Sequence, residues 1–353
     1  MIAIANTYPA SKEAWDKIWH ECSYATYFHS REWIEIWRRF TQDQTQAEPK
    51  IIQFSDQKTA LLPFAFRQRA KGLMNTYTSA MEGTFGGWIS SDNLRLEHIR
   101  LLIDFLLNQL KGNLSWRINP YDDLLSKIPI QAEHNCCLIN PEDPNSTKAI
   151  SALLELGHPI FILDETQTLN LDDGFNSLFK SQSSSVRKAK KASKAGVSIK
   201  VIQTPEEWRE YYQVYQASLE RWHSSSGYAW ELFEVMQQLN SPNIKLWVAV
   251  YDNQIVCGAL CFYSKHHVVY WHGCALEQYF ELRPVNLMML EIIRNSCEQG
   301  YSWFDFNPSG GMKGVKAFKA SFGAKAVPCP QIYVDTPIKR LARSYLLAKQ
   351  GSF

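Results

Sequence analysis

The sequence predicts an α/β (α+β) protein of two related domains, residues 1–165 and 166–353, each with a mixed, mostly antiparallel sheet flanked by helices. The chain has 353 residues, more than a single hydrophobic core usually serves. Apolar residues in the second half follow the order strand, two helices, three antiparallel strands, helix, strand, helix, strand. The first half follows a looser version of this order, so we expect two domains of similar architecture.

The composition excludes several classes of protein. Hydrophobic residues make up 45% of the chain, charged residues 20%, and the net charge is +2. This balance excludes a histone-like or polyacidic protein but leaves room for a local basic patch. We expect a soluble, cytoplasmic protein without a transmembrane segment, because the N-terminus lacks signal-peptide character and no apolar run approaches the roughly 20 residues that span a bilayer. Eight scattered cysteines without a C-x-x-C pair predict reduced core thiols.

Serines mark the first two helices of the N-terminal domain. Ser11 is expected to cap a helix at 11–20, and Ser30 a helix at 30–41. The further elements expected in this half are strands at 49–55 and 59–67, a helix at 92–111, a strand at 114–118, a helix at 147–156 and a strand at 159–171. The stretches 76–88 and 119–147 are predicted to be irregular. Asp172 is expected to cap the next helix.

The C-terminal domain carries stronger local signals. Thr204, Pro205 and Glu207 predict a helix N-terminus with a capping box, and Asp252-Asn253 predicts a hairpin turn. The elements expected here are strands at 197–203, 244–251, 254–263, 267–274 and 301–306, and helices at 204–221, 229–239, 284–299 and 312–321 with a helical tail at 337–349.

Four segments of the second half resemble one known family. They are SVRKAKKASKAGVSI (185–199), YYQVYQASLERW (211–222), LRPVNLMMLEIIRNSCEQGYSWFDFN (282–307) and GVKAFKASFGA (314–324). The last is similar to the G-x-x-x-F-K-x-x-F-G signature of the FemAB-like proteins, a branch of the GNAT acyltransferase superfamily that includes the peptidoglycan-bridge aminoacyltransferases. The segment FHSREWIEIW (28–37) resembles looser relatives from polysaccharide gene neighbourhoods. The resemblance implies tandem GNAT-like domains and a transferase connected with cell-envelope biogenesis.

Lys319 is the first catalytic candidate. It stands between Phe318 and Phe322, where partial desolvation would strengthen its action on a nearby anion. In the aminoacyltransferases the matching lysine lies near the acyl end of the donor, so the resemblance implies that Lys319 stabilises the charge on the attacked carbonyl. Phe318 would then offer a stacking face for the substrate. The alternatives are a surface lysine on an amphipathic helix and a core phenylalanine. We expect Lys319 to be largely exposed and to contribute little to stability.

Two acids compete for the role of general base. Asp305 lies in YSWFDFN, on the strand that faces the transfer cleft in GNAT folds, and its aromatic neighbours suit an acid that accepts a proton from an amine. Its alternative role is structural, through bonds to nearby backbone. Glu82, in the glycine-containing loop of the first half, is the rival acid and has no motif behind it.

A basic helical face is predicted to bind substrate. Arg187, Lys190, Lys191 and Lys194 follow the i, i+3, i+4, i+7 spacing of one helix face. Such a face attracts phosphate groups, and its alternative is an ordinary solvated helix.

Arg221 and Trp222, at the end of a predicted helix, are further substrate-binding candidates. A guanidinium binds phosphate or carboxylate through two parallel hydrogen bonds. An equally suitable role for Arg221 is that of a cation complementing the helix dipole.

The segment EQYFELRPVNLM (277–288) bears on the donor. GNAT enzymes that use acyl-CoA usually carry a glycine-containing pyrophosphate loop here, and this segment has no glycine. The departure favours a donor other than acyl-CoA, and the resemblance to the peptidoglycan aminoacyltransferases, which also lack this loop, implies aminoacyl-tRNA; acyl-CoA bound in a different way is the alternative. The acceptor is expected to be an amine on a small molecule or glycan precursor. No metal or cofactor is expected, since His266, His267 and His272 lack a ligand pattern. The second hypothesis is a non-catalytic basic and aromatic module that binds RNA or a phosphorylated glycan precursor.

Overall fold

The computed structural model describes residues 1–69, 74–79, 81–82, 84–110, 112–143, 157–180, 183–224 and 227–337. The chain forms two compact units: unit 1 comprises Met1–Thr166 and the chain from Val327, and unit 2 comprises Gln167–Ala326. The predicted helix at 147–156 and all but the first residue of the predicted tail at 337–349 lie outside the described residues. None of the described helices is long and apolar enough to cross a membrane.

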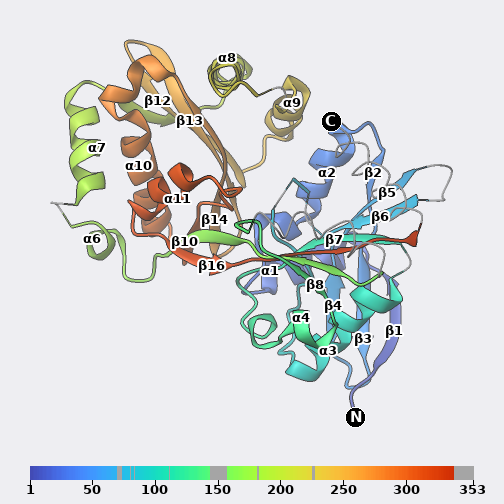
Figure 1. Ribbon diagram of the computed structural model, residues 1–353. Helices are drawn as coiled ribbons and strands as arrows, with labels where there is room; N and C mark the ends of the chain where they lie inside the picture. The colour runs from blue at the N-terminus through green and yellow to red at the C-terminus, as the bar shows by residue number, and fades with distance from the viewer. Residues whose placement is uncertain are drawn as a thin grey trace. The chain divides into compact units, whose positions relative to one another are not determined.

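Unit 1 contains a seven-stranded mixed sheet (Figure 1). Its strands, in spatial order, are β2 (Thr45–Ala47), β5 (Ala65–Arg69), β6 (Met74–Thr78), β7 (Asn113–Arg117), β17 (Gln331–Val334), β9 (Ile160–Ile162) and β8 (Cys137–Ile139). Neighbours are antiparallel except β6–β7 and β8–β9. The predicted domain 166–353 is therefore wrong at its C-terminal end, because β17 completes this sheet by pairing with β7 and β9.

In a second sheet of unit 1, two strands bury side chains on both faces. Its strands are β1 (Ile4–Pro9), β3 (Lys50–Phe54) and β4 (Thr59–Leu62). Alternation sends Ile51 and Leu61 into one hydrophobic cluster, and Ile52 and Leu62 into another. The predicted strand 59–67 is split after Leu62, where Pro63 has no N–H to donate.

The helices of unit 1 confirm the predicted serine caps. They are α1 (Lys12–Glu21), η1 (Tyr27–His29), α2 (Arg31–Phe40), α3 (Leu96–Asp104), the π-helical turn η3 (Phe105–Gln109), η4 (Leu125–Lys127) and α4 (Ile130–Glu133). The hydroxyls of Ser11 and Ser30 accept the amides of Ala14 and Trp33, both at 3.1 Å.

Unit 2 is built on the other seven-stranded sheet. Its strands, in spatial order, are β11 (Ser198–Val201), β12 (Ile244–Tyr251), β13 (Gln254–Tyr263), β14 (His267–Ala275), β15 (Trp303–Asp305), β10 (Glu165–Asn170) and β16 (Lys325–Pro328). β14 and β15 are parallel, whereas β11–β12, β12–β13, β13–β14 and β10–β15 are antiparallel. The predicted fold class, tandem α/β units with mixed and mostly antiparallel sheets flanked by helices, is confirmed.

Helices cover both faces of this sheet. They are α6 (Phe175–Leu178), α7 (Ser184–Lys194), α8 (Pro205–Arg221), α9 (Trp230–Leu239), η5 (Glu277–Leu282), α10 (Pro284–Glu298) and α11 (Lys313–Ala320). α7 and α10 lie on one face, and α8 and α9 on the other (Figure 1). The capping box of Thr204 with Glu207 is confirmed. The prediction that Asp172 caps a helix is wrong, because Gly174, at φ 76°, precedes α6.

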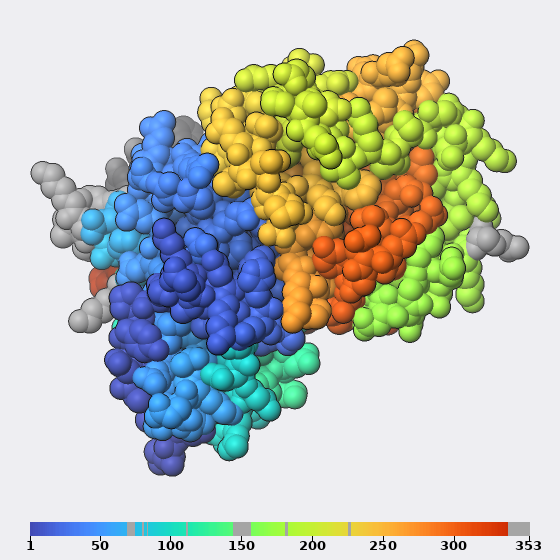
Figure 2. Space-filling model, turned by 180° about the vertical axis from the view of Figure 1, so that it is seen from behind, coloured from blue at the N-terminus to red at the C-terminus, as the bar shows by residue number. Residues whose placement is uncertain are grey.

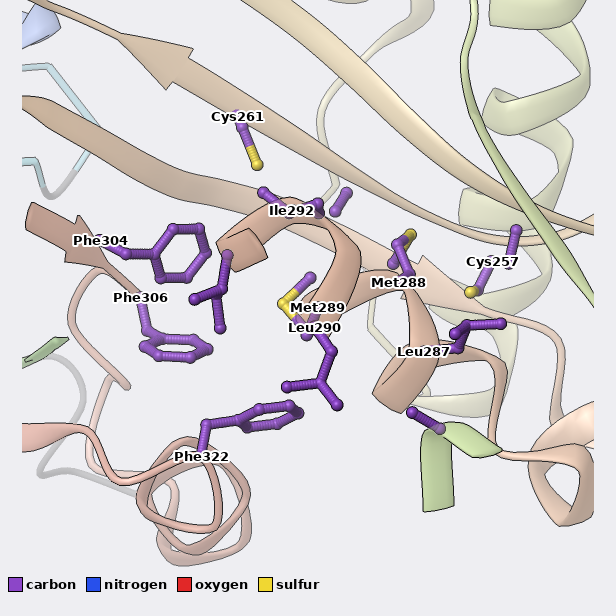
Figure 3. Packing of buried hydrophobic residues seen from close by; sticks show 14 of the residues in the cluster. Cys257, Cys261, Leu287, Met288, Met289, Leu290, Ile292, Phe304, Phe306 and Phe322 are labelled. Carbon is purple, nitrogen blue, oxygen red and sulfur yellow. The ribbon is translucent and has the colours of Figure 1, made fainter. Parts of the chain in front are cut away.

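The core of unit 2 forms between α10 and the sheet. Met288, Met289 and Ile292 of α10 are buried in one cluster with Cys257 and Cys261 of β13 (Figure 3). All eight cysteines are free thiols, and six are buried, which confirms the prediction of reduced core thiols. Burial raises the pKa of both β13 thiols, so they stay protonated and inert at neutral pH.

Candidate functional site

The ladder between β14 and β15 stops partway along β14. The parallel pairing runs from His267 with Trp303 to Val269 with Asp305. β14 continues to Ala275 along β13, whereas β15 ends at Asp305 and the chain turns at Asn307, whose φ is 62°. The edge of β14 beyond Val269 therefore separates from β15, and its polar backbone groups lose that strand as a partner.

A β-bulge coincides with this separation. Leu260 pairs with His272 and Cys261 with Tyr270, so Trp271 is an extra residue on β14. A bulge shifts the alternation of side chains by one position and ends regular pairing. The predicted strand 267–274 is present, but its regular alternation is interrupted here.

The bulge places Trp271 and His272 on the same face of the sheet. Tyr228 stacks on Trp271 at a centroid distance of 5.0 Å and also lies 6.0 Å from the ring of His272. Tyr270 packs instead against the core cluster that contains α10. Its hydroxyl leaves no room for a side chain at Gly273. An isolated glycine in a strand is a weak sequence signal for a bulge, and Gly273 carried that signal.

His272 is a neutral imidazole inside an aromatic cluster. Its Nδ1 lies 2.6 Å from the hydroxyl of Tyr211, and its ring meets Tyr215 edge-on at 4.4 Å. Burial lowers the pKa of His272 to about 3. At neutral pH it therefore packs and hydrogen-bonds as an uncharged ring.

The catalytic candidates Lys319 and Asp305 meet on the backbone of Asn307. Lys319 Nζ donates to the carbonyl oxygen of Asn307 at 2.5 Å, and Asp305 Oδ1 accepts the amide of Asn307 at 2.6 Å. Lys319 is 3% exposed and Asp305 is fully buried. The expectation of a largely exposed Lys319 is wrong, because α11 directs this side chain toward the turn that ends β15. That turn is further held by Ser309, whose hydroxyl donates to Gln167 Oε1 at 2.6 Å.

The phenylalanines beside Lys319 in the sequence pack against each other. Phe318 meets Phe322 edge-on at 5.1 Å, and Phe322 contacts Phe306 at 5.8 Å (Figure 3). Phe322 is buried and Phe318 is half-buried. Phe318, which belongs to α11, thus stays partly exposed to solvent.

Glu82 belongs to unit 1. It is exposed, has a φ of 52°, and lines a groove of about 440 Å³ together with Trp37 and Arg67. Within unit 2 the structure brings Lys319 and Asp305 together.

The predicted basic face is present on α7. Arg187, Lys190 and Lys191 are exposed, while the opposite face buries Ser185, Ala189 and Ala192. Lys191 lies 3.9 Å from Glu281. The prediction that these cations lie together on one side of a helix is confirmed, whereas their role in binding stays a prediction.

Arg221 hydrogen-bonds to the backbone of β14 and also contacts two exposed aromatic rings. Its Nη1 donates to the carbonyl oxygen of Ala275 at 2.9 Å, at the end of β14. Its guanidinium also lies between the rings of Trp222, at 5.5 Å, and Phe280, at 4.8 Å. These two rings are 48% and 38% exposed, so unit 2 has an exposed aromatic platform at the C-terminus of α8. Phe280 was not among the predicted site residues, because it comes from a segment distant in sequence.

The segment in place of a pyrophosphate loop is a 3₁₀-helix, η5. The amides of Tyr279, Arg283 and Asn286 donate to the carbonyls of Leu276, Phe280 and Arg283 at 3.0–3.2 Å. These donors are therefore satisfied within the chain, which agrees with the absence of glycine here.

Comparisons with known proteins agree with this geometry. Residues 180–320 match the family model described as an acetyltransferase (GNAT) domain. The structure of FemX has a TM-score of 0.67 at 12% identity, covering 95% of this chain and 99% of that one. A conserved protein of unknown function from Bacteroides thetaiotaomicron has a TM-score of 0.52 at 10% identity, covering 95% and 100%.

A third solved structure is the C-terminal domain of a protein assigned as a lysylphosphatidylglycerol synthetase, from Agrobacterium fabrum. Its TM-score is 0.53 at 12% identity, and the similarity covers 94% of this chain and 93% of that one. No curated protein sequence matches the chain. At these identities the similarity concerns the fold, and at that level the predicted resemblance to the FemAB-like branch of the GNAT superfamily is confirmed.

Proposed function

Because residues 180–320 form a GNAT domain in a chain with the fold of FemX, we propose that this protein is an N-acyltransferase that moves an aminoacyl or acyl group onto an amine. The observation that carries the proposal is the separation of β14 from β15 after Val269, together with the bulge at Trp271. A strand edge that has left its neighbour, beside a bulge, can hold an extended donor by main-chain hydrogen bonds.

The proposed reaction is attack by a neutral amine on the carbonyl carbon of an ester or thioester. The new C–N bond forms, the bond to the leaving oxygen or sulfur breaks, and the amine proton passes to a base while the leaving group gains a proton. Positioning, oxyanion stabilisation and one proton acceptor suffice for this chemistry. We assign the oxyanion to backbone N–H groups on the edge of β14 after the bulge, between Trp271 and Cys274.

Lys319 and Asp305 act, in this proposal, on the turn that follows β15. By holding the carbonyl and amide of Asn307, they fix the end of β15 where it leaves β14. The buried ammonium also adds positive potential there, which favours a developing anion.

Asp305 and Glu82 are the two acids proposed as proton acceptor. Asp305→Asn and Glu82→Gln separate them, because removal of the acting base should abolish the acidic limb of the pH–rate profile, where protonation of that base slows the reaction.

We further propose aminoacyl-tRNA as the donor. The hydrogen-bonded η5 segment argues against a CoA pyrophosphate cradle at this place. Arg187, Lys190 and Lys191 would contact RNA phosphates, and Trp222 and Phe318 would stack on bases. Arg221 would strengthen the platform through its stacked guanidinium. A small molecule or a cell-envelope glycan precursor would supply the amine.

Mass spectrometry of acceptors incubated with the native protein tests the proposal. Charged tRNA, acetyl-CoA and a no-donor control are compared across candidate amines, and transfer adds the donor's acyl mass to the acceptor. Lys319→Ala, which removes the cation that holds the turn after β15, should lower transfer by about 10²–10³-fold, while the Glu298→Gln control at an exposed position should not change it. Circular dichroism verifies that both variants are folded. No acyl product with any donor would refute the transferase proposal.

A second candidate function is a non-catalytic module that binds RNA or a phosphorylated glycan precursor. The exposed basic face of α7 and the exposed rings of Trp222 and Phe280 favour it. Salt-dependent RNA binding without transfer from any donor would support this candidate over the enzyme.

A further inference from the structure

A groove lies between α6, α7 and α10, on the face of the unit 2 sheet opposite α8 and α9. It has a volume of about 440 Å³. Val186, Ala189 and Lys190 of α7 face Leu287 and Leu290 of α10 across it. The α7 residues follow i, i+3, i+4 spacing and the α10 residues i, i+3 spacing, so each helix turns one side toward the groove. Figure 2 shows the green segment of α6 and α7 alongside the orange segment of α11, which agrees with the hydrogen bond from Ser185 Oγ to the carbonyl of Ser321.

The floor of the groove is apolar and partly aromatic. Phe175 and Phe179 of α6 have centroids 5.0 Å apart with a tilt of 33°. Phe179 is buried, while Phe175 is half-buried and lies under the guanidinium of Arg294 at 4.6 Å. The part of Phe175 that stays exposed therefore offers an apolar, aromatic surface to a ring-shaped group.

The rim is positively charged. Lys180 and Lys190 are exposed, and among the described residues neither lies within ion-pair distance of a carboxylate. The third cation, Arg294, is paired with Glu291 at 2.9 Å. The groove thus combines an apolar floor with two lysines whose charge is not neutralised by an acidic neighbour.

We infer that this groove is a binding site for a nucleoside phosphate. The base would lie against Phe175 and Phe179, and the phosphate would lie between Lys180 and Lys190. The volume falls within the roughly 300–1,000 Å³ of small-molecule sites. An uncharged apolar ligand would leave the lysines unused, and an inorganic anion would leave the aromatic floor uncovered. The ligand can be a free nucleotide or one nucleotide of an RNA chain, since both present the same chemistry.

The site is separate from the proposed transfer centre. Its residues lie on α6, α7 and α10, whereas the aromatic cluster beside the bulge lies on α8, α9 and β14. Binding at the groove is measured without turnover, so its outcome does not depend on whether the chain transfers an acyl group.

Calorimetry of the full chain with uridine and adenosine monophosphate tests the inference. Lys190→Glu should weaken binding roughly tenfold, because charge reversal replaces an attraction by a repulsion at close range. Lys194→Glu is the matched control, since Lys194 is exposed on the same helix but does not line the groove, and should change binding less than about twofold. Lys180→Glu repeats the test from the other side of the groove. Uridine without its phosphate should bind at least roughly tenfold more weakly than uridine monophosphate.

A short single-stranded RNA forms the second arm. Mononucleotide binding supports a free nucleotide as the ligand, whereas RNA binding alone, weakened by both Lys190→Glu and Phe175→Ala, supports a nucleotide within a chain. Thermal melting confirms that Phe175→Ala is folded, and Lys180→Glu replaces it if it is not. Equal losses from Lys190→Glu and Lys194→Glu would reduce the effect to diffuse attraction and overturn the site. Absence of binding by both nucleotides and RNA would overturn it as well.

Discussion

Replacing Lys319 with alanine should impair both stability and turnover. Lys319 is 3% exposed, and its ammonium donates to the carbonyl oxygen of Asn307 at 2.5 Å. The same Asn307 gives its amide to Asp305. Removing Lys319 therefore takes a charged donor from a turn that sits where β15 separates from β14. The sequence alone predicted a loss of turnover with an unchanged fold, and the burial of Lys319 changes the second half of that prediction.

The magnitude follows from the contact. A hydrogen bond from a charged group contributes about 1.5–3 kcal/mol, and a buried carbonyl that loses its donor costs a similar amount. For a domain of this size each kcal/mol corresponds to about 2–4 °C in Tm, so Lys319→Ala should melt about 3–12 °C lower. A displacement of about 1 Å at a reacting centre costs about 10²-fold in rate, and loss of an oxyanion donor about 10²–10³-fold. We expect kcat to fall within this range, while KM for the acceptor changes much less.

Differential scanning calorimetry and steady-state transfer kinetics measure these effects. Lys313→Ala is the control, because Lys313 is exposed on the same helix, α11, and its loss should leave Tm within about 1 °C. Lys319→Met keeps most of the apolar stem and separates packing from charge. Lys319→Arg should not fully restore turnover, since a planar guanidinium does not fit a point-charge site. A Lys319→Ala protein with normal melting and normal turnover would refute the reasoning.

Three further predictions concern the donor, the basic face and pH. Acetyl-CoA should bind weakly in calorimetry, and micromolar affinity, about −8 kcal/mol, would count against an aminoacyl-tRNA donor. Reversing Arg187, Lys190 and Lys191 to Glu should weaken RNA binding and flatten its dependence on salt, whereas an unchanged slope would make α7 an ordinary solvated helix. The free energy of unfolding should fall as pH decreases from about 6.5 toward 4, as measured by urea titration. Burial lowers the pKa of His29 to about 4 and that of His272 to about 3, so the unfolded chain binds protons that the folded chain excludes; equal stability at pH 7 and pH 5 would contradict this.

Local signals predicted much of the fold. The capping box at Thr204 and the serine caps at Ser11 and Ser30 act within one helical turn, and each is present where the sequence placed it. The Asp252-Asn253 turn forms with φ values of 49° and 59°, which these residue types tolerate. The cationic spacing from Arg187 onward also required no knowledge of the rest of the chain. Such features are decided by short-range sterics and hydrogen bonds, so the sequence alone determines them.

Only the tertiary structure decided how the proposed site is assembled. The bulge at Trp271 lies where β14 continues along β13 after its three-residue pairing with β15 has ended, and no local pattern specifies both registers. Residue type favours exposure for both Lys319 and Asp305, yet both are buried and hydrogen-bond to the backbone of Asn307. β17 joins unit 1 because its alternating apolar residues complete the sheet between β7 and β9. Strand pairing and the burial of charged groups depend on partners distant in the chain, and that is the physical reason why the sequence by itself left them undetermined.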